Sequence, residues 1–180
     1  MPTEISGSTG VNKIQDGTVV NADINSSAAI AGSKLVMPSG SVLQVVQSSS
    51  VPADRTTSSS TSAWVTHYGL AITPSSTSSK ILIQVTQPLM LTGSSNMNRG
   101  GLRLERGSTT IWNTDDFREQ VQFRNADTEG NQLSHITYLD SPSTTSATTY
   151  NLQFSMMSGS GMYMFDRAEG ANMVLMEIAG

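Results

Sequence analysis

The sequence predicts an all-β protein, and three observations lead to this fold class. Short stretches of alternating apolar and polar residues recur along residues 40–180, and turns rich in Gly, Ser and Asn separate them. No amphipathic helix longer than a few turns interrupts the series. Apolar residues make up 37% of the chain and charged residues only 13%, so uncharged polar residues and Gly dominate. Together these features are typical of an antiparallel β-sandwich or jelly roll.

The composition also limits the function classes that fit the chain. Lys and Arg are few and scattered and the net charge is −4, which does not favour binding to nucleic acid or to a membrane surface. The chain has no cysteine, which excludes disulfides and thiolate metal sites. The low apolar content favours an oligomer, because subunits that share a core compensate for a small core in each.

Residues 1–39 are expected to form a separate N-terminal segment. The first residues lack the basic and apolar regions of a signal peptide, which predicts synthesis in a cytoplasm and no membrane insertion. Apolar residues recur in the segment, but it is too short to form its own core. Ser26 or Ser27 is expected to cap a short helix over residues 28–35. Such a segment needs a partner, and its candidate anchoring residues are Ile14, Val19, Val20, Ile24, Ile30 and Leu35.

Residues 40–180 are expected to form one β domain. The clearest strand covers residues 80–91, in which the odd-numbered apolar residues Ile81, Ile83 and Val85 share one face. A hairpin is expected around Gly107-Ser108, between strands at 102–105 and 109–113. The Ser/Thr-rich residues 48–62 are expected to form a loop. Further strands are expected at residues 41–47, 64–72, 132–139, 148–157, 161–165 and 172–178.

Catalytic and metal-binding patterns are scarce. Each of the two histidines, His67 and His135, lies in or beside an expected strand without neighbouring ligands, which favours a structural role. A weaker alternative places His135 on a symmetry axis, where three copies could bind one ion. No Gly-x-Ser-x-Gly elbow accompanies the many serines. We therefore expect no enzymatic activity, no cofactor and no metal.

Charge is concentrated in residues 113–131. The simplest interpretation is a solvated loop, and the alternative is a recognition loop carried by a rigid β scaffold. Two aromatic residues nearby favour sugar or protein contact, whereas adjacent carboxylates on a strand would point to opposite faces and fit catalysis poorly. The candidate receptor-contact residues are Trp112, Asp115, Asp116, Phe117, Arg118 and Arg124.

Two parts of the chain resemble a known class of proteins. Residues 14–35 (IQDGTVVNADINSSAAIAGSKL) resemble a segment of fibre-like virion proteins of tailed phages. The C-terminal head domain of the same proteins resembles residues 72–83, 102–111, 138–150 and 176–180, in the same order. The resemblance covers well over half of the chain, but residues 113–131 and 156–170 depart from it.

The resemblance implies a homotrimer whose heads are jelly rolls similar to tumour-necrosis-factor-like and complement-type globular domains. Residues 1–39 would then be a stalk or virion anchor that contacts other virion proteins. The implied function is a tail fibre on the virion surface, whose head loops bind a host receptor, for which a glycan is one candidate. The alternative is a capsid decoration or head fibre protein docked on the shell through its N-terminal segment. A depolymerase that cuts surface polysaccharide is the least favoured.

Overall fold

The structure is a computed structural model that describes residues 24–25, 27, 35–49, 51, 55–58, 63–93, 98–114, 121–123, 129–165 and 170–180, with backbone only at 55–58 and 121–123. The chain divides into the units Met1–Val36 and Met37–Gly180. The division expected between residues 39 and 40 stays a prediction.

The first unit offers few described residues. Ile24 and Leu35 are exposed, and the backbone N–H of Ser27 donates a hydrogen bond to the side chain of Asn25. The other candidate anchoring residues, Ile14, Val19, Val20 and Ile30, lie outside the described residues. So does most of the helix expected at 28–35.

The second unit confirms the all-β prediction, and every expected strand is present. Two short strands, β2 and β7, lie in segments expected to be loops, so that expectation was wrong there. Neither shows an alternating pattern, and each is held by pairing with a longer neighbour. The strands are β1 (Val42–Gln47), β2 (Arg55–Ser58), β3 (Val65–Ile72), β4 (Lys80–Thr92), β5 (Asn98–Arg106), β6 (Thr109–Asn113), β7 (Val121–Phe123), β8 (Glu129–Asp140), β9 (Thr148–Ser158), β10 (Gly161–Met164) and β11 (Asn172–Ile178).

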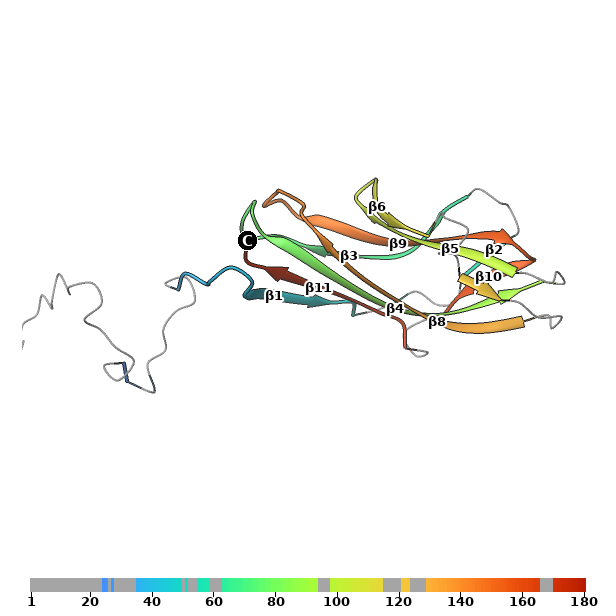
Figure 1. The fold of residues 1–180 in the computed structure, drawn as a ribbon, viewed down its shortest axis with the longest axis horizontal. Helices are drawn as coiled ribbons and strands as arrows, with labels where there is room; N and C mark the ends of the chain where they lie inside the picture. The colour runs from blue at the N-terminus through green and yellow to red at the C-terminus, as the bar shows by residue number, and fades with distance from the viewer. Residues whose placement is uncertain are drawn as a thin grey trace, which may run out of the picture. The chain divides into compact units, whose positions relative to one another are not determined.

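These strands form two antiparallel sheets that pack face to face as a sandwich (Figure 1). Sheet A has the order β1-β11-β4-β10-β2, with β8 also paired to β4. Sheet B has the order β3-β9-β5-β6, with β7 also paired to β5. Without the short strands β2, β7 and β10, two four-stranded sheets remain, β1-β11-β4-β8 and β3-β9-β5-β6. This arrangement is a jelly roll, as the sequence predicts.

Strand β4 is the centre of sheet A. Along one edge it pairs with β8 over its full length, and along the other it pairs first with β11 and then with β10. Pro88 lies between the last residue paired with β11, Thr86, and the first paired with β10, Leu89. A proline has no N–H to donate to the sheet, so a long strand tolerates it best at a point such as this, where the neighbouring strand changes.

The core lies between the sheets and is built from one face of each long strand. In β9, Tyr150, Leu152, Phe154 and Met156 are almost fully buried, as the alternation predicts. Sheet A contributes the odd-numbered residues of β4 and alternate residues of β11. The buried side chains of sheet A include Ile81, Ile83, Val85, Leu89, Leu91, Met162, Met164, Met173 and Leu175.

The hairpin between β5 and β6 is confirmed. Gly107 and Ser108 form its two-residue loop, and Gly107 has a φ of 60°. A positive φ at the first loop position alone is typical of a type II′ turn, whose twist matches that of the flanking strands. A non-glycine residue at this position would be strained, so the turn chemistry fixes this corner of sheet B.

Candidate assembly and recognition surfaces

The outer face of sheet A aligns apolar side chains from four strands. In β4 the odd-numbered residues are buried, so the even-numbered residues point away from sheet B. Leu82 lies between Met176 of β11 and Leu139 of β8, and Met176 lies next to Val45 of β1. Val45 is 57% exposed and Leu139 is 50% exposed, so both ends of the set face solvent. We call these four residues the apolar row.

Further apolar pairs lie on the same face. Val42 pairs with Ile178 on one side of the apolar row, and Pro88 pairs with Leu133 on the other. Leu133 is 53% exposed. Contiguous exposed apolar area on a protein surface usually marks a contact with another molecule.

Among the described residues of this face, charged side chains lie only at its two ends. Lys80 is opposite Ile178 at one end, and Glu129 is opposite Thr92 at the other. Between them, the described side chains that point outward from sheet A include no Asp, Glu, Lys or Arg. Burying an unpaired charge is costly, and the centres of protein interfaces are depleted in charged residues. The outer face of sheet A is therefore suited to burial against protein.

An open depression of about 200 Å³ lies in the middle of the face. His135 is exposed there, and its Nδ1 atom lies 3.2 Å from the Oγ1 atom of Thr86. A polar band thus separates the apolar row from the Pro88–Leu133 pair. The outward side chains that line the depression are Gln84, Thr86, His135, Thr137, Asn172 and Val174.

The outer face of sheet B is polar instead. The Gln153 amide donates to Thr66 Oγ1 at 2.9 Å and to Glu105 Oε2 at 2.7 Å. Arg103 donates through Nε to Gln153 Oε1 at 2.6 Å, and its Nη2 lies 2.8 Å from Glu105 Oε1. These four residues, which we call the polar network, come from β3, β9 and β5. The guanidinium group of Arg103 also lies over the Trp64 ring, 4.6 Å from the ring centroid, in a cation–π contact.

Two buried carboxylates close one end of the sandwich, and Glu177 of β11 is the first. Ser75 donates to Glu177 Oε1 through both its N–H and its hydroxyl, each at 2.6 Å, and Gln44 donates to Oε2 at 2.6 Å. Burial by itself raises the pKa of Glu177, but these hydrogen bonds outweigh it and lower the pKa to about 2. The carboxylate therefore stays ionised and holds the β3–β4 loop against β11.

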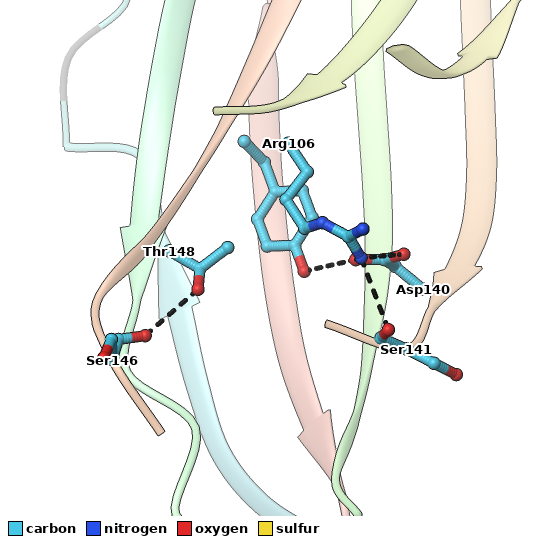
Figure 2. Close-up of polar contacts among 6 residues, drawn as sticks. Arg106, Asp140, Ser141, Ser146 and Thr148 are labelled. Atoms are coloured by element: carbon cyan, nitrogen blue, oxygen red, sulfur yellow. Dashed lines mark hydrogen bonds and ion pairs between the residues drawn. The ribbon is translucent and has the colours of Figure 1, made fainter. Parts of the chain in front are cut away.

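The second carboxylate, Asp140 at the end of β8, joins the two sheets (Figure 2). Arg106 Nη1 of β5 donates to both Asp140 oxygens at 2.9 Å, and the Tyr150 hydroxyl of β9 donates to Oδ2 at 2.7 Å. Burial, followed by the hydrogen bond to Asp140, raises the pKa of Tyr150 well above its usual range. The phenol therefore remains a donor, and the cluster anchors β8 of sheet A to sheet B.

The structure places few of the candidate receptor-contact residues. Trp112 lies on β6, is half-buried and packs against the core. Asp115, Asp116, Phe117, Arg118 and Arg124 lie outside the described residues, so their role as a receptor-contact group stays a prediction.

The two histidines differ in their surroundings. His67 is 2% exposed and packs edge-on against Tyr68 and Phe154, with ring centroids 5.2 and 6.0 Å away. This placement fits the structural role expected from the sequence. His135 is exposed on the outer face of sheet A, and its position on a symmetry axis stays a prediction.

Two searches within the described part of the chain gave negative results. None of its segments is a helix long and apolar enough to span a bilayer. Its His, Cys, Asp and Glu side chains form no group of three or more that could hold a metal ion.

Comparison with known proteins gives distant structural similarities. No protein-family model and no curated protein sequence matches the chain. Among solved structures, the VP2 subviral particle of infectious bursal disease virus is similar over 76% of this chain and 33% of its own, with a TM-score of 0.43 and 13% identity. The T=1 particles derived from infectious bursal virus are similar over 85% of this chain and 36% of theirs, with a TM-score of 0.44 and 15% identity. The chain thus spans about a third of the length of these proteins.

Proposed function

We propose that this protein is a structural component of a bacteriophage virion: a homotrimeric tail-fibre protein on the virion surface, anchored through residues 1–39. The observation that carries the assembly is the outer face of sheet A, which bears the apolar row and whose described side chains include no Asp, Glu, Lys or Arg between Lys80 and Glu129. Three such faces packed around a common axis remove each apolar row from water. The sequence resemblance of residues 14–35 and of the head segments to phage fibre proteins supports the phage assignment.

The assembly is tested by the solution mass of the full chain and of a Leu139→Lys variant, measured by light scattering. Leu139 is half-exposed on an edge strand, so lysine there leaves the fold intact but puts a charge into the contact. We expect three chains per particle for the wild type and one for the variant. Thr149→Lys, at an exposed site on the outer face of sheet B, is the matched control and stays trimeric. A monomeric wild type, or a trimeric Leu139→Lys, would exclude this face as the interface.

Host binding by the head is the second part of the proposal. Replacing residues 115–120 and 124–128 by Gly/Ser segments spares β7 and β8, so the jelly roll is kept. We expect phage that carry this variant to lose attachment to host cells while they assemble normally. Full attachment would assign recognition to another surface.

The position on the particle is tested separately. An antibody against the head should label the tail of intact virions. Label over the shell would instead favour the capsid decoration or head-fibre alternative, in which residues 1–39 dock on the capsid.

A further inference from the structure

We propose that the outer face of sheet B carries a binding site for a neutral saccharide, formed by the partly exposed Trp64 indole and the Arg103 guanidinium group that lies over it. This site is distinct from the loop residues 115–128. It lies on the sheet opposite the proposed assembly face, so a ligand can reach it in a monomer or in the trimer.

The first observation is the way sheet B accommodates Trp64. Val65 pairs with Phe154, which places Trp64 beside Ser155, and Ser155 pairs with Gly101. A Cβ added to Gly101 would lie 2.8 Å from Trp64 Cη2 and would also contact Met157 Cε. The indole therefore extends across β9 to lie over Gly101 of β5, where a larger residue would require the Trp64 and Met157 side chains to move. Trp64 is partly exposed in this position.

The second observation is that the groups beside the indole are already ordered. Glu105 accepts from Arg103 and Gln153 with both of its oxygens, and Gln153 uses its carbonyl and its amide. The Arg103 side chain is 22% exposed and reaches the surface, whereas Glu105 and Gln153 are buried, at 9% and 7% exposure. A site whose side chains are held in place before binding loses little conformational entropy when a ligand arrives.

The charges and the geometry together select the ligand class. Arg103 and Glu105 neutralise each other, so the site offers no net charge to a phosphate, a sulfate or a cation. An aromatic ring beside planar amide and guanidinium groups suits a sugar, which presents an apolar face of C–H bonds and a rim of hydroxyls. Thr66, Asn113 and Asn151 lie in the same or the next cross-strand row and extend the hydroxyl and amide surface.

The test uses saturation-transfer-difference NMR on the full chain with glucose, galactose, mannose and N-acetylglucosamine as separate probes. We expect signals from the ring protons of at least one sugar for the wild type. Trp64→Ala should lose most of that signal, whereas Trp64→Phe, which keeps an aromatic ring, should retain part of it. Thr149→Ala, on the same face but away from the indole, should behave as the wild type. The melting temperature of each variant shows that it is folded.

Three results would overturn the site. The first is the absence of signal from all four sugars with the wild type. The second is an undiminished signal with folded Trp64→Ala, and the third is loss of signal with Trp112→Phe but not with Trp64→Ala. Because the measurement needs neither virion nor host, its failure leaves the proposed virion function standing. Likewise, a monomeric wild type would not remove the saccharide site.

Discussion

At the scale of single residues, Glu177 makes the stability of the head depend on acidity. The carboxyl is 1% exposed, and its pKa lies near 2 in the folded chain against an ordinary value of 4.5. Because the folded-state pKa is the lower one, its contribution is complete above about pH 4.5 and disappears as the pH falls toward 2. The shift corresponds to roughly 3 kcal/mol of unfolding free energy.

We therefore predict that the unfolding free energy of the wild type, measured by urea denaturation, falls steeply as the pH is lowered from about 4.5 toward 2. Glu177→Gln should be less stable at neutral pH and should lose much less stability on acidification, because the amide does not titrate. If the unfolding free energies of the two proteins fall with the same slope below about pH 4.5, other carboxyls dominate acid unfolding.

The Asp140 cluster gives a second prediction at this scale. Tyr150→Phe removes one hydrogen bond to a buried carboxylate and should lower the unfolding free energy by about 1.5–3 kcal/mol, the range for hydrogen bonds to charged groups. Tyr138→Phe is the matched control, because Tyr138 is half-buried against the same core and its hydroxyl forms no hydrogen bond with another described residue. Denaturant titration measures both variants. Equal effects would mean that the Tyr150 hydroxyl contributes nothing beyond ring packing.

At the scale of elements, the β5–β6 hairpin depends on one backbone angle. Gly107 has a φ of 60°, and a Cβ there would meet no atom within 4 Å. Gly107→Ala should therefore cost about 1–2 kcal/mol through backbone strain alone, without a steric clash. Ser108→Ala, in the same turn, should change the unfolding free energy by less than about 0.5 kcal/mol. A neutral Gly107→Ala would show that the loop relaxes to another turn type.

How well the sequence predicts an element depends on whether one of its faces is buried. Strands β4 and β11 bury alternate residues, and β9 turns its alternate apolar residues toward the core, so the alternation predicts where these strands lie and which face points inward. Strand β2 has the sequence RTTS, which carries no such pattern, and it forms because β10 offers a free edge. The pairing of β2 with β10 joins segments that are far apart in the chain, so local patterns do not predict it.

The surfaces were harder to predict than the strands for the same reason. The sequence places Arg103 and Glu105 on one face of β5, but Gln153 and Thr66 join them only through the register of β9 and β3. Likewise, Val45 and Leu139 are far apart in sequence and occupy one row only because β11 and β4 lie between them. Alternation predicts which way a side chain points, whereas register decides its neighbours.

At the scale of the whole molecule, a trimer held through the outer face of sheet A couples folding to concentration. Each isolated subunit would expose the apolar row, including Val45 and Leu139 at its ends, so association stabilises the folded chain.

We predict that the melting temperature falls by roughly 2–4 °C for each tenfold dilution, as expected for a chain of this size when three copies unfold together. Calorimetry or fluorescence melting over a dilution series measures this. Leu139→Lys should melt at a lower temperature that does not change with concentration, because a monomer has no association term. A wild type whose melting temperature is equally independent of concentration, with the mass of one chain, would mean that this face is not covered by copies of the protein.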